Sequence, residues 1–132
     1  MNWDLLIPLL VTTVIAVIGW WIVHWFSMRR DRINKRRDLR VQYLIDAYRK
    51  LEYASNRPIS PETAPDFEKA VADIQLFGSP RQVKLAQEFA VGMAESGTYS
   101  LDEIMVDLRQ DLRKELLLPE VPAKIKYWRL TF

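Results

Sequence analysis

The chain has 132 residues, a net charge of +2 and no cysteine. This length allows one small domain, and the absence of cysteine excludes disulfide bonds and thiolate chemistry. The charge is unevenly distributed. Residues 29–40 hold seven basic and two acidic side chains, residues 41–118 hold nine basic and thirteen acidic ones, and residues 119–132 hold three basic side chains and one acidic side chain. A basic segment, an acidic body and a basic tail therefore follow one another.

Residues 5–28 form an apolar run without a formal charge, and Arg29 and Arg30 close it. A helix of these twenty-four residues would extend roughly 36 Å, enough to cross a hydrocarbon core of about 30 Å. The run predicts an N-terminal transmembrane helix, with residues 1–4 outside the cytoplasm. It lacks the basic start and the small-x-small cleavage site of a signal peptide, so we expect it to be retained.

Seven cations follow the predicted span, and none precedes it. They form the basic collar: Arg29, Arg30, Arg32, Lys35, Arg36, Arg37 and Arg40. The positive-inside rule places the collar in the cytoplasm, which predicts a single-pass inner (plasma) membrane protein with its N-terminus outside. We also expect the collar to attract anionic membrane lipids, at about 1 kcal/mol per cation. Nucleic acid is not expected as a partner, because no recognisable nucleic-acid-binding fold accompanies these charges.

Small residues share one face of the predicted span. Thr12, Ala16 and Gly19 follow one another at spacings of four and three, which would allow a second helix to approach closely. This face is a candidate for span-to-span packing, and a homo-oligomer is one way to supply the second span. The alternative is ordinary background, because small residues are common in membrane helices.

Residues 29–56 combine the collar with a first cytosolic helix. Val41, Leu44, Tyr48 and Leu51 repeat at helical spacing, and this helix could continue from the span without a break. A coiled coil of several chains is an alternative, although the stripe covers fewer than two heptads. Prolines at positions 58, 61 and 65 predict a loop over residues 56–65.

Residues 57–118 predict a helical bundle. A second helix begins at residue 65 or 66 and ends at Gly78. A third begins with a capping box between Ser79 and Gln82 and ends before Gly97. Their inward residues are expected to be Phe67, Ala70, Val71, Ile74 and Phe77 in the second helix, and Val83, Ala86, Phe89, Ala90 and Met93 in the third. The pattern predicts short connections between antiparallel helices.

The fourth predicted helix begins with a capping box between Ser100 and Glu103 and ends at Pro119. Its inward residues are expected to be Leu101, Ile104, Met105, Leu108, Leu112 and Leu116. The predicted fold class is therefore all-α: one N-terminal transmembrane helix, a small cytosolic bundle of about four helices, and a short C-terminal tail over residues 119–132.

Four carboxylates follow one another at intervals of four residues along the last helix. They form the acidic flank: Glu103, Asp107, Asp111 and Glu115. One interpretation is a solvated face that Lys114 partly neutralises. Another is docking against a basic surface, either the collar of a neighbouring chain or a separate protein. We do not expect a metal site, because no second helix offers a matching set of ligands.

The basic tail interleaves large apolar residues with cations, from Lys124 to Phe132. This pattern suits a short strand, a docking peptide or a membrane-surface segment. We favour an interpretation in which Trp128 and Phe132 fold back and complete the core of the bundle, because exposed aromatic side chains are costly to leave in water.

Signatures of catalysis are missing from the sequence. The only histidine lies in the predicted span, and the four glycines are scattered rather than grouped in a phosphate-binding loop. We expect no enzyme activity, no cofactor and no bound metal. The layout resembles that of small bacterial one-pass membrane proteins, although no motif connects it to a particular family.

These patterns predict a protein-interaction domain held at the inner membrane, acting as a scaffold, regulator or assembly factor. The candidate partner surface is the acidic flank together with Trp128 and Phe132, and the protein partner is not identified by the sequence. The alternative is a membrane-active protein of the toxin or holin kind, which would work through self-association of the transmembrane helix.

Overall fold

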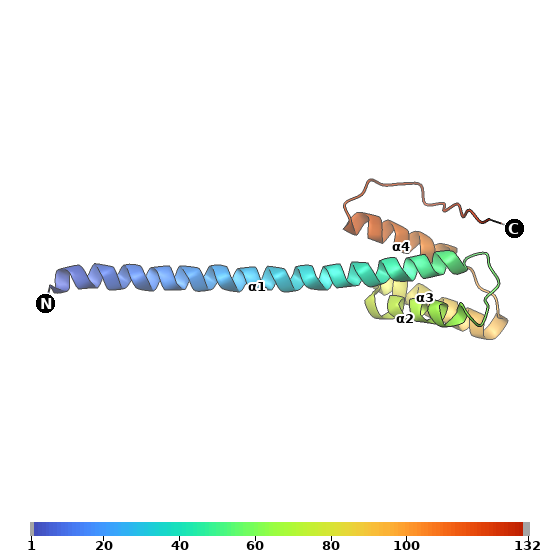
Figure 1. The fold of residues 1–132 in the computed structure, drawn as a ribbon, viewed down its shortest axis with the longest axis horizontal. Coiled ribbons are helices and arrows are strands. Elements are labelled where there is room, and N and C mark those ends of the chain that lie inside the picture. Colours follow the sequence, from blue (N-terminus) through green and yellow to red (C-terminus); the bar gives the residue numbers. More distant parts are fainter. Residues whose placement is uncertain (1, 131–132) are drawn as a thin grey trace. The chain divides into compact units, whose positions relative to one another are not determined.

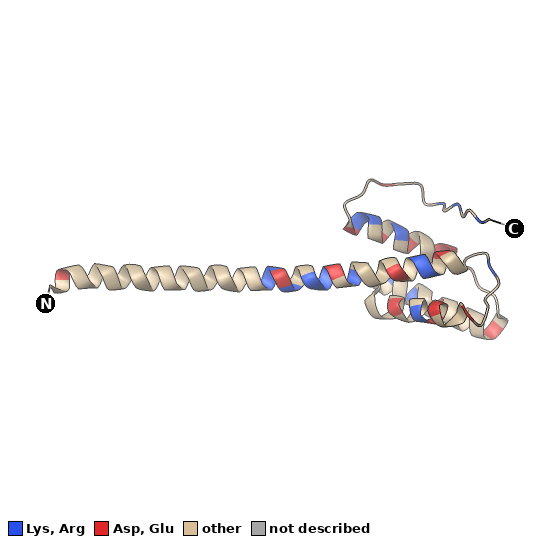
Figure 2. Ribbon diagram, viewed as in Figure 1, with Lys and Arg blue, Asp and Glu red and all other residues tan. Residues whose placement is uncertain are grey.

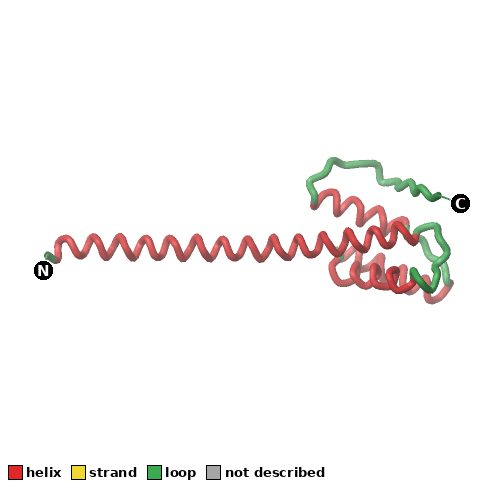
Figure 3. Tube along the Cα trace, viewed as in Figure 1, coloured by secondary structure: helices red, strands yellow, loops and turns green. Residues whose placement is uncertain are grey.

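The computed structural model describes residues 2–130, and its secondary structure among these residues is entirely helical (Figures 1 and 3). The four helices are α1 (Trp3–Ala54), α2 (Ala64–Phe77), α3 (Pro80–Ser96) and α4 (Asp102–Glu115). The chain divides into two units that meet between Asp38 and Leu39, inside α1. We call the second unit the helical domain. The predicted all-α fold class is confirmed.

The first unit contains the apolar part of α1. The most apolar window of this helix has no buried residue. Large side chains along it are well exposed, with Leu9 at 66%, Ile15 at 64% and Trp21 at 68%. Apart from Asp4 in its first turn, the charged residues of α1 follow the apolar run, where blue and red segments alternate (Figure 2). The N-terminal part of α1 is therefore long and apolar enough to cross a membrane.

The predicted span and the first predicted cytosolic helix form one continuous helix. Residues 29–40 contain arginine, lysine and leucine, which favour helix, and no glycine or proline. α1 ends at Ala54, where Ser55 donates to the Leu51 carbonyl and Asn56 takes a left-handed conformation with φ of 58°. The prolines that follow keep residues 56–63 out of a helix, as the sequence predicts.

The core of the helical domain is built by one face of each helix. It contains Leu44, Ala47 and Leu51 from α1; Phe67, Ala70, Val71 and Ile74 from α2; Ala86 and Phe89 from α3; and Ile104, Met105, Leu108 and Leu112 from α4. Two predicted inward residues are wrong, because Ala90 and Leu116 are exposed. Gln82 is fully buried instead, which the sequence analysis missed.

The capping box of α3 is confirmed. The Ser79 amide donates to Gln82 Oε1 at 2.9 Å, and the Gln82 amide donates to Ser79 Oγ at 3.3 Å. At Gly78, directly before this cap, an added Cβ would clash with the Ile74 carbonyl oxygen. α3 ends at Ser96, and the φ of 69° at its C-cap Gly97 favours glycine.

The capping box predicted for α4 is wrong. The N-cap position is occupied by Leu101, and Ser100 accepts instead from the Asp102 amide, in a local turn at 3.2 Å. Serine therefore stands one position too early to cap this helix. The predicted end at Pro119 is also wrong, because α4 ends at Glu115 and Leu117 takes a φ of 55°.

Candidate functional site

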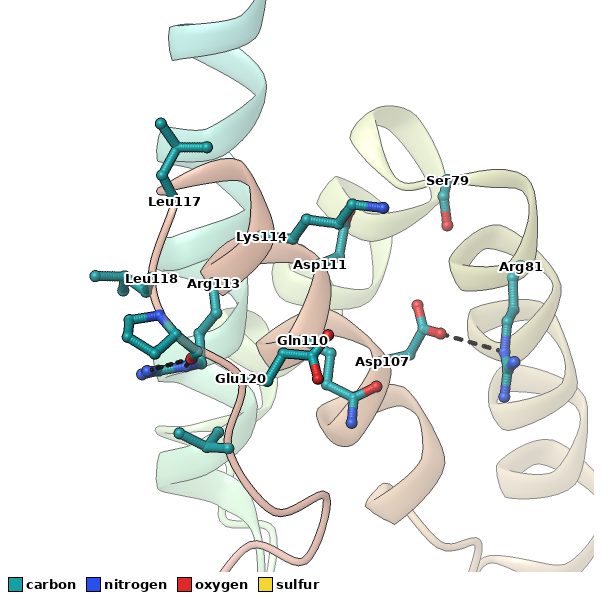
Figure 4. A pocket seen from close by; sticks show the side chains of 12 residues that line it. Ser79, Arg81, Asp107, Gln110, Asp111, Arg113, Lys114, Leu117, Leu118 and Glu120 are labelled. Carbon is teal, nitrogen blue, oxygen red and sulfur yellow. Dashed lines mark hydrogen bonds and ion pairs between the residues drawn. The ribbon is translucent and has the colours of Figure 1, made fainter.

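The acidic flank of α4 is paired within the chain. Asp111 Oδ2 accepts from Arg40 Nη2 at 2.8 Å, and Glu115 Oε1 lies 3.6 Å from Arg40 Nη1. Asp107 Oδ1 lies 3.2 Å from Arg81 Nε (Figure 4). Glu103 is exposed. Three of the four carboxylates therefore face arginines that belong to α1 and α3.

Arg40 and Asp111 are the centre of what we call the polar node. Arg40 Nε also donates to the Phe77 carbonyl at 2.9 Å, and Asp111 Oδ2 also accepts from Gln82 Nε2 at 3.0 Å. Gln82 is fully buried, and the side chains of Arg40 and Asp111 are 28% and 26% exposed. The node thus joins α1, the end of α2, α3 and α4 through charge-assisted hydrogen bonds.

This arrangement changes two interpretations made from the sequence. Arg40 was assigned to the lipid-facing collar, but it is engaged inside the helical domain. The interpretation that Lys114 partly neutralises the acidic flank is incomplete, because Arg40 and Arg81, which lie on other helices, form ion pairs with it. The six other collar residues are exposed on α1. Spacing along one helix could not show which partners the fold brings to it.

An open groove of about 890 Å³ lies beside the C-terminal half of α4. Figure 4 shows the side chains that line it: Ser79, Arg81, Asp107, Gln110, Asp111, Arg113, Lys114, Leu117, Leu118, Pro119, Glu120 and Val121. Both charge signs occur in it, and its hydroxyl group belongs to Ser79, which already caps α3. The lining offers no histidine or cysteine as a base or nucleophile. Across the described residues, no group of three His, Asp or Glu side chains could hold a metal ion.

A second, smaller groove of about 350 Å³ is mainly apolar and lies between α2 and α3. Phe67 and Phe89, both buried, contribute to its lining, with ring centroids 5.5 Å apart. The lining also contains the small residues Ala64, Ala72 and Ala90. The sequence assigns Phe67, Val71, Phe89, Ala90 and Met93 to the core, and in the structure these five residues also line the groove.

The tail returns across the helical domain as an extended segment (Figures 1 and 3). Ile125 and Tyr127 pack against the core, whereas Trp128 is 79% exposed. The expectation that Trp128 completes the core is therefore wrong. Phe132 lies outside the described residues. A short strand is not formed by the part of the tail that is described, up to Leu130.

Arg129 fixes the end of the tail to α1. Its Nη1 donates to Glu52 Oε1 at 2.8 Å, and its Nη2 donates to the carbonyl oxygens of Glu52 and Ser55. These carbonyls belong to the last turn of α1 and the residue after it, where a helix leaves acceptors without intrahelical partners. Burial raises the pKa of Tyr127 above its usual value of 10, and it does the same for Tyr48.

The first residues of the tail are held by two arginines of α4. Arg113 Nη2 donates to the Pro119 carbonyl at 2.9 Å, and Arg109 Nη2 donates to the Pro122 carbonyl at 3.3 Å. The function of these arginines in the structure is to hold the chain as it leaves α4.

The candidate packing face of the span is exposed within the first unit. Thr12 Oγ1 donates to the Pro8 carbonyl at 2.7 Å, so its hydroxyl is satisfied inside the helix. Thr12 and Ala16 line a shallow notch of about 400 Å³, and a Cβ at Gly19 would meet no atom within 4 Å. The face is open to a second helix, and packing against one stays a prediction.

No protein-family model matches the chain, and no characterised protein or solved structure shows significant similarity to it. The function proposed below therefore depends on the chain's own residues and their geometry. Two features of these residues carry it: an apolar helix that the described chain leaves uncovered, and a helical domain with exposed apolar side chains.

Proposed function

We propose that the protein is a single-pass inner-membrane protein whose cytosolic helical domain binds another protein. It would act as a scaffold, regulator or assembly factor, without catalysis. The observation that carries this proposal is the complete exposure of the apolar window of α1. About twenty apolar residues that bury nothing in their own chain need a hydrocarbon solvent.

The collar supports the proposed orientation. Six of its cations, from Arg29 to Arg37, are exposed on α1 directly after the apolar run, as expected for a segment held in the cytoplasm beside anionic lipid. Residues 1–4 contain no lysine or arginine, so the distribution of lysine and arginine on the two sides of the apolar run supports the same orientation.

Exposed apolar side chains support a binding function for the helical domain. Leu76 is 73% exposed, Trp128 is 79% exposed, and the apolar groove between α2 and α3 is open. Scattered exposed leucines are normal, but an aromatic side chain and an open apolar groove on a small domain are typical of protein-binding surfaces. In the groove beside α4, the carboxylates of Asp107 and Asp111 are paired with arginines and the Ser79 hydroxyl caps α3, which supports binding rather than catalysis.

The membrane part of the proposal can be tested with single-cysteine variants, because the chain has no cysteine of its own. We expect Asn2→Cys to react with a membrane-impermeant maleimide on intact spheroplasts, and Glu120→Cys to react only after lysis. Alkaline carbonate should leave both variants in the membrane fraction. Release by carbonate, or labelling in the opposite order, would refute this part.

The binding part can be tested by cross-linking full-length protein in intact membranes and identifying the proteins that become attached. We expect one specific protein to be captured by the full chain and not by a variant that ends at residue 40. Equal capture by both would show that the helical domain contributes nothing.

The toxin or holin alternative has less support. The apolar run carries no charge that could line a conducting pore, and the hydroxyls of Thr12 and Thr13 donate to backbone carbonyls of their own helix. Growth arrest on expression of residues 1–40 alone would favour it.

A further inference from the structure

The tail presents two different faces over residues 124–130. Its inward face is Ile125, Tyr127 and Arg129, all partly buried. Its outward face is Lys124, Lys126, Trp128 and Leu130, all exposed. A strict alternation of this kind is the pattern of an extended chain, in which successive side chains point to opposite sides.

The inward face holds the tail against the helical domain. Ile125 and Tyr127 pack on the core, and Arg129 binds Glu52 and the carbonyls at the end of α1. Upstream, Arg109 and Arg113 hold the carbonyls of Pro122 and Pro119. Side chains therefore fix both ends of the segment, so much of the entropy lost in ordering it has been lost before any partner arrives.

Most backbone groups of the described tail residues form no hydrogen bond. Among described residues 119–130, no backbone–backbone hydrogen bond is formed. The carbonyls that accept a bond do so from arginine side chains, as at Pro119, Pro122 and Trp128. An extended and immobilised segment with unpaired amide and carbonyl groups is a template for an added strand.

The outward face indicates which strand would be added. Lys124 and Lys126 require negative charges opposite them, and Trp128 and Leu130, which are 79% and 61% exposed, require apolar side chains. The tail of a second copy would bring the same lysines and Arg129, and like charges across a strand pair are destabilising. Charge complementarity therefore selects an acidic partner rather than a second copy.

We propose that residues 123–130 form a docking edge for an extended segment of a partner protein in which acidic and apolar residues alternate. The partner segment pairs with the tail backbone, places carboxylates beside Lys124 and Lys126, and packs apolar side chains on Trp128. This inference rests on the proposed function, and it identifies the tail as the surface that performs it.

The test uses full-length protein in detergent micelles and a fluorescein-labelled peptide of eight residues that alternates glutamate and valine. We expect saturable binding by fluorescence anisotropy. K124E/K126E should weaken it at least about tenfold, because two attractive pairs become repulsive. The control K69E/K84E reverses two exposed lysines on α2 and α3 and should leave binding unchanged. A lysine–valine peptide should bind K124E/K126E better than it binds the wild-type protein.

Two further measurements test backbone pairing and the choice of partner. Replacing two central valines of the peptide with proline keeps its charge and removes amide donors, so binding should fall at least about tenfold. A fluorophore on Leu130→Cys should move to an apolar environment only when the peptide is added. Equal binding of the proline peptide, or no binding of the glutamate–valine peptide, would overturn the proposal.

The labelled Leu130→Cys variant also shows whether anionic lipid or a second copy of the chain occupies the outward face of the tail instead. A blue shift of the fluorophore emission without peptide, seen in phosphatidylglycerol nanodiscs but not in phosphatidylcholine nanodiscs, would assign the outward face to anionic lipid and overturn the proposal. Ready oxidation to a disulfide-linked dimer would assign it to a second copy, with the same consequence. If K124E/K126E still captures the partner identified by cross-linking in membranes, this inference fails while the proposed function stands.

Discussion

Replacing Asp111 with alanine should destabilise the helical domain more than any other change to the acidic flank. The side-chain amide of Gln82 is fully buried, and its Nε2 would lose the acceptor that Asp111 Oδ2 provides at 3.0 Å. A buried donor without a partner costs about 1–3 kcal/mol. Arg40, which is only 28% exposed, would also lose the nearer of its two carboxylates, at 2.8 Å, and would keep Glu115 at 3.6 Å, so we expect a total of about 2–4 kcal/mol.

The matched control is Asp107→Ala on the same helix. Its partner Arg81 is 73% exposed, and an ion pair of this kind contributes at most about 1 kcal/mol. Asp111→Asn gives a second comparison, because an amide oxygen can still accept from Gln82 while the charge is lost. We expect its effect to fall between those of Asp107→Ala and Asp111→Ala.

Hydrogen exchange measured by mass spectrometry on full-length protein in detergent would give these differences in the presence of the span. The amides of Met105 and Leu108 lie in the buried face of α4, and their protection should fall about 30- to 900-fold in Asp111→Ala if the domain opens as a unit. Protection at the apolar part of α1 serves as an internal reference. Equal losses of protection in Asp111→Ala and Asp107→Ala would refute the claim that the polar node stabilises the helical domain more than the Asp107–Arg81 ion pair does.

Three further outcomes are expected. Leu108→Ala should cost about 2–5 kcal/mol, because Leu108 is fully buried among α-helices, and a shift in the thermal unfolding midpoint would measure it. Gly78→Ala should cost about 1–3 kcal/mol by the same assay, since its Cβ would lie 2.4 Å from the Ile74 carbonyl, whereas no loss would show that the α2–α3 turn adjusts freely. The raised pKa of Tyr127 means that its contribution to tail docking is complete below pH 10 and is lost as the pH rises through the higher folded-state value; Tyr127→Phe should remove this part of the pH dependence of hydrogen exchange in the tail.

Local patterns predicted the helices and most of the core. The stripe of Val41, Leu44 and Leu51 and the faces of α2 and α4 repeat at the helical period, and the structure buries most of them. The Ser79–Gln82 box succeeds because a serine, a proline and a glutamine at fixed spacing determine one local geometry. Ser100 and Glu103 share the spacing of a capping box, but the chain enters α4 one residue later. Two adjacent start positions differ little in local energy, so tertiary packing decides between them.

The candidate site could not be predicted in the same way. The acidic flank is visible in the sequence, but its partners Arg40 and Arg81 come from other helices, 71 and 26 residues away in the chain. Trp128 and Tyr127 are equally plausible core residues by composition. Arg129 fixes the register at the end of α1, and this register turns Tyr127 inward and Trp128 outward.

The helical class, the long apolar N-terminal helix and the uneven distribution of charge could all be predicted from the sequence, because each depends on residues that are close together in the chain. The pairing of the charges, the burial of Gln82 and the exposed face of the tail became visible only in the folded chain. The two groups of features differ in the range of the interactions that produce them. Helical period and hydropathy act within a few residues, whereas a buried polar node or a docked tail exists only after distant segments have packed together.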